Sequence, residues 1–501
     1  MTETFLGIDA GTSAIKVCAF DAQGALLKKV QRVVPVITPY PRWAEIDLNR
    51  YWQLLLEALR ELTAQVGPVS AVGLSTTCPT TILLDEQRQP VRHAMVYLDG
   101  RADGVVRDTV GPDAVALLAR TGNRASTSTC WAANLRWVRQ HEPETWQRVR
   151  SVCMLNSFLA MRMTGELAID PTQASYSGLM DVRQPEARWD EGLLALWDVP
   201  AACLPPIVRG SDCLGRITPQ AAGATGLPVG TPLALGVADT ASAAFALQLR
   251  DNGQAFESVG TSGVITFCMD QPDFEAGFLH RHHVYPNRWL AHGAMSTLGG
   301  SFGWLQTNIW PEVKSLAELE RLAQESLPGS NGLIFLPYLA GERSPIWDSA
   351  ASAAWIGLRL GHTRGDMVRA VFEGTAFGLR QIMELAQRKW GLKPQRMVGV
   401  GGGSHSRFWA QIKADILRLE YGTTEFLDAG ALGAALLGAM AGGFFSGLQD
   451  ERLPTVKISS QWVRPSSAQP HDVYQRHFDV FTRLYPALSA SMHELGREAV
   501  C

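Results

Sequence analysis

The chain has 501 residues, of which 46% are hydrophobic and 19% are charged, and its formal net charge is −3 at pH 7. This length exceeds what one hydrophobic core usually supports, so we expect two domains, residues 1–248 and 249–501. A slightly acidic chain has no general basic surface, which excludes nucleic acid and anionic membrane as expected partners.

The cysteines and the first residues point to the cytoplasm. The eight cysteines include no Cys-x-x-Cys pair, which is typical of reduced thiols and not of a disulfide framework or a zinc site. Residues 1–4 carry an acid where a signal peptide carries bases. The uncharged stretch of residues 429–445, rich in glycine and alanine, is short for a membrane span. Its Gly438 and Gly442 predict a buried helix that packs closely on a neighbour.

The first motif is a hairpin. Residues 5–20 predict two short apolar strands, and the small residues between them include Asp9, Gly11, Thr12 and Ser13. Glycine lets the backbone approach a phosphate closely, and a carboxylate holds Mg²⁺ directly or through water. An ordinary turn is the alternative, because Asp, Gly and Thr are common turn residues.

Polar residues follow two further predicted strands of the first half. Thr77 and Cys78 lie in a threonine-rich connection that either offers hydroxyls to a polar ligand or simply holds β-branched strand residues. Asp99 and Arg101 follow the apolar strand at 95–98, where an α/β sheet exposes its binding edge, so they are candidates to bind substrate hydroxyls. A surface ion pair that opens the next helix is the alternative.

Asp239 lies where a buried strand, residues 231–238, runs into an alanine-rich helix. Taken alone, this position favours a helix N-cap, whose carboxylate accepts a backbone N–H. The functional alternative is a general base at a strand end that points into a cleft.

A second hairpin repeats the first near the middle of the chain. Residues 257–267 have the same strand, tip and strand pattern, with Gly260, Thr261 and Ser262 at the tip. Two similar halves that each offer such a tip suggest a nucleotide clamped between them.

Two other patterns in the second half suggest different chemistry. The three histidines within residues 280–283 match no zinc signature, so we expect a solvated strand end there. The Gly-x-Ser-x-Gly pattern around Ser301 matches the nucleophile elbow of serine hydrolases, and a hydrolase is one alternative function. That motif needs a buried strand directly before it, and residues 294–298 are only weakly strand-like.

Towards the C-terminus, Thr363 and Asp366 predict a capping box that opens a long helix through Trp390. A glycine-rich turn then joins a strand at 397–400 to a helix, which lets a nucleotide approach the backbone; it consists of Gly401, Gly402, Gly403 and Ser404. The chain has no Gly-Lys dipeptide and no G-x-G-x-x-G, so neither a P-loop NTPase nor a Rossmann dehydrogenase is supported.

These motifs, in this order, resemble the FGGY family of carbohydrate kinases. The resemblance runs from Gly7 to about Gly443 and includes the segments 162–166, 335–345 and 369–374. It implies an α/β fold of two actin-like, ribonuclease-H-like ATPase domains, with a nucleotide and sugar cleft between them. It also implies a kinase that transfers a phosphate of ATP to a ketopentose or a related polyol.

The resemblance assigns roles to the motifs. It implies that Asp9, Gly11, Thr12 and Ser13 face the phosphates of ATP, and that Asp239 is the catalytic base. Mg²⁺ would lie at Asp9 and Asp239. The further implied contacts are phosphate binding by Gly260, Thr261 and Ser262, adenosine binding by Gly401, Gly402, Gly403 and Ser404, and sugar binding by Thr77, Cys78, Asp99, Arg101 and Asp239. The expected partners are ATP, Mg²⁺, a small sugar or polyol, and a second copy of the chain in a homodimer.

The chain departs from the family where the sugar is chosen. FGGY kinases that act on xylulose carry Gln-Met-His where this chain has Thr77, Cys78 and Pro79, and Pro-Lys where it has Ala133 and Asn134. The imidazole is missing, so another ketopentose, a tetritol or a pentitol fits a reshaped pocket as well as D-xylulose does. The altered loop also leaves open a non-catalytic ATP-binding sensor.

Overall fold

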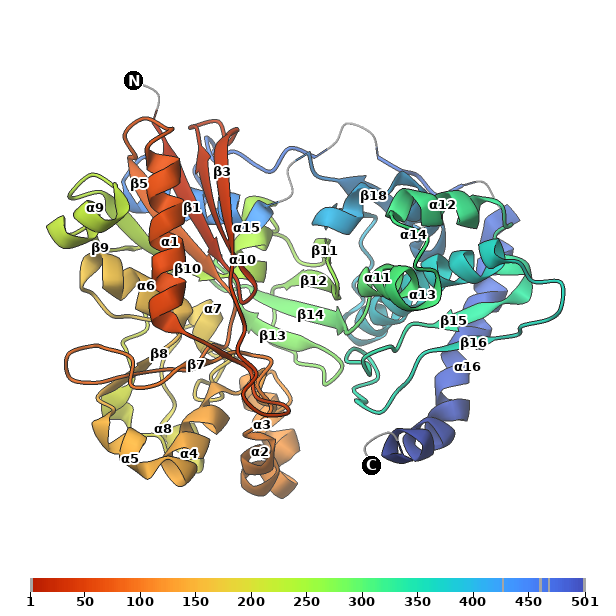
Figure 1. Cartoon of the computed structure of the whole chain (residues 1–501), viewed down its shortest axis with the longest axis horizontal. Coiled ribbons are helices and arrows are strands. Elements are labelled where there is room, and N and C mark those ends of the chain that lie inside the picture. Colours follow the sequence, from red (N-terminus) through yellow and green to blue (C-terminus); the bar gives the residue numbers. More distant parts are fainter. Residues whose placement is uncertain (1–2, 426–427, 459–461, 467–468, 499–501) are drawn as a thin grey trace. The chain divides into compact units, whose positions relative to one another are not determined.

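The computed structural model describes residues 3–425, 428–458, 462–466 and 469–498. The chain forms two compact units. The first contains Met1–Arg250, Met269–Leu290 and Asp428–Val456, and the second contains Asp251–Cys268, Ala291–Leu427 and Lys457–Cys501. These units are discontinuous in sequence, so the expected domain boundary after residue 248 stays a prediction. Each unit combines a mixed sheet with helices, which confirms the α/β class (Figure 1).

The first unit is built on a six-stranded sheet with the order β3-β2-β1-β5-β10-β9. The predicted hairpin is confirmed as an antiparallel pair, whose first strand also pairs in parallel with β5, itself parallel to β10. The strands are β1 (Phe5–Ala10), β2 (Ala14–Phe20), β3 (Leu26–Val33), β5 (Ala71–Thr76), β9 (Cys213–Arg216) and β10 (Pro232–Ala238). Three neighbouring parallel strands therefore end at the same edge.

Helices cover the two faces of this sheet. α1 (Leu48–Thr63) packs its apolar side on β2 and β3, in front of the sheet in Figure 1. α15 (Ala429–Ala441) packs on β1 and β5 so closely that a Cβ on Gly7 would lie 1.7 Å from the carbonyl oxygen of Ala431. A Cβ on Gly438 would lie 2.6 Å from the backbone of Val72, which confirms the predicted close-packed helix.

The other elements of the first unit complete its layers and an outer, mostly helical region. The helices are α2 (Asp103–Val110), α3 (Ala114–Thr121), α4 (Trp131–His141), α5 (Pro143–Arg148), α6 (Leu155–Thr164), α7 (Pro171–Ala174), α8 (Glu191–Trp197), α9 (Pro219–Thr225) and α10 (Asp239–Ala246). The short strands are β4 (Glu45–Ile46), β6 (Ile82–Leu84), β7 (Ala94–Met95), β8 (Ser151–Cys153) and β13 (Leu279–His282).

The second unit repeats the arrangement of the first hairpin. β11 (Ala255–Val259) pairs antiparallel with β12 (Gly263–Met269) and parallel with β17 (Arg396–Val400). β17 in turn pairs in parallel with β18 (Glu420–Thr423), and β14 (Trp289–Met295) lies on the other side of β12. Both halves thus contain a hairpin, as the duplicated motif predicted, and the structure adds a parallel strand beside each.

Helices surround the second sheet. The predicted capping box of Thr363 and Asp366 is confirmed at the start of α13 (Arg364–Trp390), and Gly391 ends this helix in the left-handed conformation. The other helices are α11 (Gly300–Trp304), α12 (Leu316–Gln324), α14 (Arg407–Leu417) and α16 (Gln469–Glu498), and a small pair of strands is formed by β15 (Ile334–Leu336) and β16 (Ala354–Ile356).

The cysteines within the described residues are all free, and most are buried, as the sequence predicted; Cys501 lies outside the described residues. Within the same residues, no helix is both long and apolar enough to cross a membrane.

Candidate active site

The carboxyl ends of β1, β5 and β10 bring together the polar residues that the sequence singled out in the first unit. Asp9 lies near the end of β1, and its Oδ1 accepts a hydrogen bond of 3.0 Å from the hydroxyl of Ser75 on β5. Asp239 follows β10 directly. Parallel strands expose their carboxyl ends at one edge, which is where open α/β sheets bind ligands.

Neighbouring charges shift the pKa of the Asp9 carboxyl in opposite directions. Burial raises the pKa of its carboxyl above the ordinary value, and the nearby carboxylates of Asp239 and Asp428 raise it further. Lys16, whose Nζ lies 3.6 Å from Oδ2 of Asp9, opposes this shift, as does the hydrogen bond from Ser75. Clustered carboxylates of this kind are stabilised by a cation, and an oxygen-only set suits Mg²⁺.

Asp428 and Gly430, at the start of α15, belong to this site, and the sequence analysis missed both. Asp428 accepts from Lys16 at 2.8 Å and from Lys29, and these bonds lower the pKa of its carboxyl although burial alone would raise it. A Cβ on Gly430 would lie 3.6 Å from Oδ1 of Asp9, so glycine keeps the space beside that carboxylate open. An acid directly before a long uncharged helix is the only sequence signal for Asp428.

The hairpin tip is held by hydroxyl contacts. The hydroxyl oxygens of Thr12 and Thr77 lie 3.2 Å apart, which joins the tip to the connection that follows β5. Tyr51 of α1 donates to the carbonyl oxygen of Gly11 at 3.0 Å. The structure therefore places Gly11 and Thr12 beside Thr77, two sequence regions predicted to bind different ligands.

The helix-cap interpretation of Asp239 is wrong. α10 begins at Asp239 itself, and its N-cap is Ala238, which has no side-chain oxygen. The Asp239 carboxylate accepts from the backbone N–H of Thr240 at 2.6 Å and from the Thr240 hydroxyl at 3.4 Å, both through Oδ1. Among the described residues nothing donates to its Oδ2, so one carboxylate oxygen remains for a ligand.

Cys78, predicted to contact the sugar, meets a residue that the sequence analysis did not single out. The Sγ of Cys78 lies 3.5 Å from Nη1 of Arg281 on β13, and this guanidinium stacks over the ring of Tyr176 at 4.0 Å. The adjacent histidines are not a solvated strand end as predicted, because His280, His282 and His283 are buried. Each bonds a backbone carbonyl oxygen, of Gly122, Val182 and Leu249 respectively.

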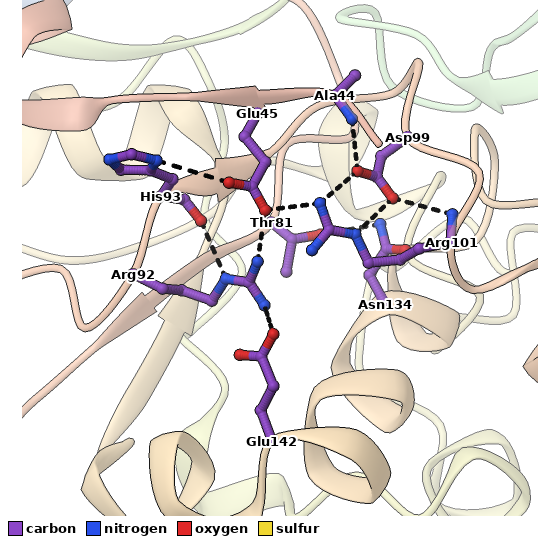
Figure 2. A network of polar contacts seen from close by, with 9 residues as sticks. All are labelled: Ala44, Glu45, Thr81, Arg92, His93, Asp99, Arg101, Asn134 and Glu142. Atoms are coloured by element: carbon purple, nitrogen blue, oxygen red, sulfur yellow. Dashed lines mark hydrogen bonds and ion pairs between the residues drawn. The ribbon is translucent and has the colours of Figure 1, made fainter. Parts of the chain in front are cut away.

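Asp99 and Arg101 form a buried network, which Figure 2 shows. Asp99 accepts from the backbone N–H of Ala44 at 2.7 Å and from Nε of Arg101 at 2.8 Å. Arg101 also pairs with Glu45 at 2.6 Å. The alternative interpretation, an ion pair on the surface, is therefore wrong. Among the described residues, Nη1 of Arg101 and Oδ1 of Asn134 are buried without a partner, so the predicted contact with a hydroxyl stays a prediction.

In the second unit, the structure joins the other two nucleotide motifs. Gly401 follows β17 with φ +101°, and a Cβ there would lie 2.7 Å from the carbonyl oxygen of Val259, the residue before Gly260. Ser404 closes this turn by donating to the carbonyl oxygen of Gly401 at 2.7 Å. The glycine-rich turn of residues 401–404 therefore packs directly beside the hairpin tip of residues 260–262.

The tip of residues 260–262 is itself docked on the start of α11. The backbone N–H groups of Leu298 and Gly300 both donate to the carbonyl oxygen of Thr261, at 2.8 and 3.0 Å. Ser301 lies within α11, and among the described residues its buried Oγ has no hydrogen-bond partner, so no base activates it. This geometry does not support the serine hydrolase alternative.

Comparison with known proteins identifies the family. The model of the N-terminal domain of the FGGY family of carbohydrate kinases matches residues 4–246, and the model of its C-terminal domain matches residues 255–442. The chain belongs to the FGGY family of carbohydrate kinases. This FGGY kinase is 31% identical to the xylulose kinase of Escherichia coli strain K12, over 97% of this chain and 99% of the relative.

Solved structures agree with this assignment. A xylulose kinase from Lactobacillus acidophilus superposes with a TM-score of 0.92 at 25% identity, covering 98% of this FGGY kinase and 100% of that chain. A gluconate kinase from the same organism gives 0.91 at 25% identity and covers 99% and 100%. These matches confirm the actin-like ATPase fold and the similarity to xylulokinases, and they make the chain a sugar kinase that uses ATP.

Proposed function

We propose that this kinase transfers the γ-phosphate of ATP to a hydroxyl of a ketopentose or a related polyol, with Asp239 as the general base. The observation that carries the proposal is the convergence of Asp9, Ser75 and Asp239 at the ends of three adjacent parallel strands. Phosphoryl transfer depends on positioning, on charge neutralisation and on a group that accepts the hydroxyl proton. The charged set of the first unit offers all three.

In the proposed reaction, a sugar hydroxyl oxygen bonds to the γ-phosphorus while the bond from that phosphorus to the β,γ-bridging oxygen breaks. The bridging oxygen leaves with its electron pair as part of ADP, and the hydroxyl proton passes to the Asp239 carboxylate. The hydrogen bonds that Thr240 donates to Oδ1 fix the orientation of this carboxylate and leave Oδ2 for the proton.

Asp9 would hold Mg²⁺, with Asp239 as the second carboxylate. In a phosphoryl-transfer site Mg²⁺ usually takes one or two carboxylates together with water and substrate phosphates. When bound, Mg²⁺ would neutralise phosphate charge. Lys16, which pairs with both Asp9 and Asp428, would reduce the repulsion between these two carboxylates.

The tip of residues 260–262 and the turn of residues 401–404 are the proposed phosphate and adenosine contacts of the second unit. Their support is the direct packing of Gly401 on Val259, which makes one continuous glycine-rich surface. Backbone at such a surface can approach a nucleotide closely and offer N–H groups to it.

The substrate class rests on the relatives and on the sugar loop. Similar proteins include kinases of xylulose and of gluconate, so the family relatives cover neutral sugars and sugar acids. Thr77 and Pro79 stand where the family members that act on xylulose have glutamine and histidine, and Cys78 stands where they have methionine, which supports a reshaped pocket.

Substitution of the base tests the proposal. Asp239→Asn should lower kcat by roughly 10² to 10⁴-fold, the usual contribution of a general base, while ATP still binds. An enzyme-coupled ADP-release assay with a panel of ketoses, pentitols and sugar acids would measure the first effect, and calorimetric titration with ATP the second. Full activity in Asp239→Asn would contradict the proposed mechanism.

A further inference from the structure

Arg281 is a buried cation beside the proposed sugar site. Its side chain and backbone together are 4% exposed, and its Nε is buried without a hydrogen-bond partner in the described part of the chain. Its Nη1 donates to the Sγ of Cys78, and the side chain also hydrogen-bonds to the Tyr176 hydroxyl. A guanidinium offers five N–H donors, so most of its hydrogen-bonding capacity is unused.

The residues that touch Arg281 do not neutralise it. Burial raises the pKa of the Cys78 thiol to about 12, although the nearby arginine opposes this shift, so the thiol is uncharged at neutral pH. Burial also raises the pKa of the Tyr176 phenol, whose ring the guanidinium covers. A buried charge without a counter-charge is costly, and a weak thiol acceptor, one uncharged phenol and its aromatic face recover only part of that cost.

Two other arginines with buried side chains form ion pairs with carboxylates. Arg101 has the carboxylates of Asp99 and Glu45 at 2.6 Å, and Arg369 has that of Glu373 at 2.8 Å. Arg281 forms no ion pair with any described residue; the carboxylate whose charge acts on it is Asp239, without direct contact. Both of these buried arginines have a carboxylate partner, and Arg281 lacks one.

We infer that the acceptor is a sugar acid and that Arg281 binds its carboxylate. This inference rests on the phosphoryl transfer of the proposed function and replaces its neutral acceptor with a polyhydroxy acid. A carboxylate matches the planar fork of a guanidinium with two parallel hydrogen bonds and supplies the missing counter-charge. Cys78 and Asp239 are both partly exposed. The inference places the carboxylate of the acceptor at Arg281 and its reacting hydroxyl at Asp239.

A carboxylate fits this place better than a phosphate ester does. One guanidinium carries one positive charge, which a carboxylate balances. The second negative charge of a phosphate would face the Asp239 carboxylate, whose charge already acts on Arg281. The phosphoryl transfer itself is unchanged, since only the far end of the acceptor differs.

The test compares acceptors that differ only at one carbon. Xylonate is paired with xylitol and gluconate with glucitol, and D- and L-xylulose complete the panel in the ADP-release assay. The wild type should favour the acid of each pair in kcat/KM by roughly 30-fold or more, the usual effect of a buried charge-assisted pair. Arg281→Met should bring that ratio close to one, mainly through KM for the acid, and Arg281→Lys should keep part of it.

Arg162→Met is the matched control. Arg162 is a half-buried arginine that also covers an aromatic ring, Trp52 at 5.1 Å, but it lies outside the proposed site. Its replacement should leave the acid-to-neutral ratio unchanged. A merely structural role of Arg281 would lower kcat/KM for both members of each pair equally, so the ratio separates the two roles.

The outcomes distinguish this inference from the proposed function. A wild type that phosphorylates neutral sugars as well as acids, or that prefers a sugar phosphate, overturns the inference and leaves the kinase intact. If no acceptor stimulates ADP release by a folded, ATP-binding wild type, the proposed function fails and the inference fails with it. The wild-type ratio decides the matter even if Arg281→Met does not fold.

Discussion

The β1–β2 hairpin of the first unit and the β11–β12 hairpin of the second have the same Gly-Thr-Ser tip. Each also pairs in parallel with a neighbouring strand, β5 in the first unit and β17 in the second. Their charges differ. Two residues before the tip, the first hairpin has Asp9 and the second has Ser258. Opposite Asp9 lies Lys16, whereas opposite Ser258 lies Val264.

The second hairpin does have an acid, but it serves a different purpose. Glu257 is fully buried and accepts from Nζ of Lys413 at 2.7 Å and from the Tyr421 hydroxyl at 2.5 Å. Because side chains alternate along a strand, Glu257 points away from the face of Ser258. The duplicated backbone therefore keeps a glycine-rich tip in both units, while only the first unit has a carboxylate there to handle a cation.

The largest difference between the hairpins should appear in activity. Asp9→Asn keeps the size of the side chain but removes its charge, so we expect kcat/KM for ATP with Mg²⁺ to fall by roughly 10² to 10³-fold. The equivalent change in the second unit, Ser258→Ala, should cost less than about 3-fold, because a half-buried hydroxyl contributes little to charge. Steady-state kinetics with varied Mg²⁺ would measure both.

An equal loss in Asp9→Asn and Ser258→Ala would contradict the division of roles between the hairpins. The division would stand if Asp9→Asn also raised the Mg²⁺ concentration required for half-maximal rate and Ser258→Ala did not.

The second difference concerns stability. Lys413→Met leaves Glu257 buried without a counter-charge, and the loss of one partner of a buried ion pair costs about 3 to 5 kcal/mol. In the first unit, Lys16→Met should cost below about 1 kcal/mol, because Lys16 is partly exposed and Asp428 keeps Lys29. Urea unfolding followed by tryptophan fluorescence would compare them.

The double variant Glu257→Gln with Lys413→Met is the control for this assignment, since it removes both charges. It should recover most of the stability that Lys413→Met loses. If Lys16→Met destabilises the protein as much as Lys413→Met does, the proposed difference is wrong: the Lys16–Asp428 pair would then be as important for stability as the Lys413–Glu257 pair.

Local patterns predicted the hairpins well, because their signals lie within a few residues. Strand residues around Gly-Thr-Ser, and a threonine three residues before an aspartate, specify a hairpin and a capping box without distant help. The strand end at Asp239 was also visible, although taken alone it favoured an N-cap, because the sequence does not tell at which residue the helix begins.

Distant pairings could not be predicted. Asp428 meets Lys16 and Lys29 from the far end of the chain, and Glu257 meets Lys413 across more than a hundred residues. Arg281 lies among histidines that suggested a solvated strand end, and only the fold places it against Cys78 and Tyr176. Such contacts depend on how the sheets bring separate segments together, and no local pattern records that.

The smallest difference concerns how pH affects stability. Burial and neighbouring carboxylates raise the pKa of Asp9 above its ordinary value of 3.8, so the folded state holds this proton more tightly than the unfolded state does. The stabilisation from that proton is complete below pH 3.8 and is lost as pH rises through the raised folded value. At neutral pH, an ionised Asp9 therefore destabilises the ligand-free protein.

Asp9→Asn removes this cost, and Lys16 keeps Asp428 as its partner. We expect the ligand-free variant to melt a few degrees above the wild type at pH 7.5, by roughly 2 to 4 °C per kcal/mol, with a smaller gain at pH 4.5. Addition of ATP and Mg²⁺ should reverse the order, since a ligand stabilises whichever protein binds it more tightly. Ser258→Ala should show neither effect. A gain that does not depend on pH would mean that Asp9 destabilises the tip through its packing, and the raised pKa would then have no part in it.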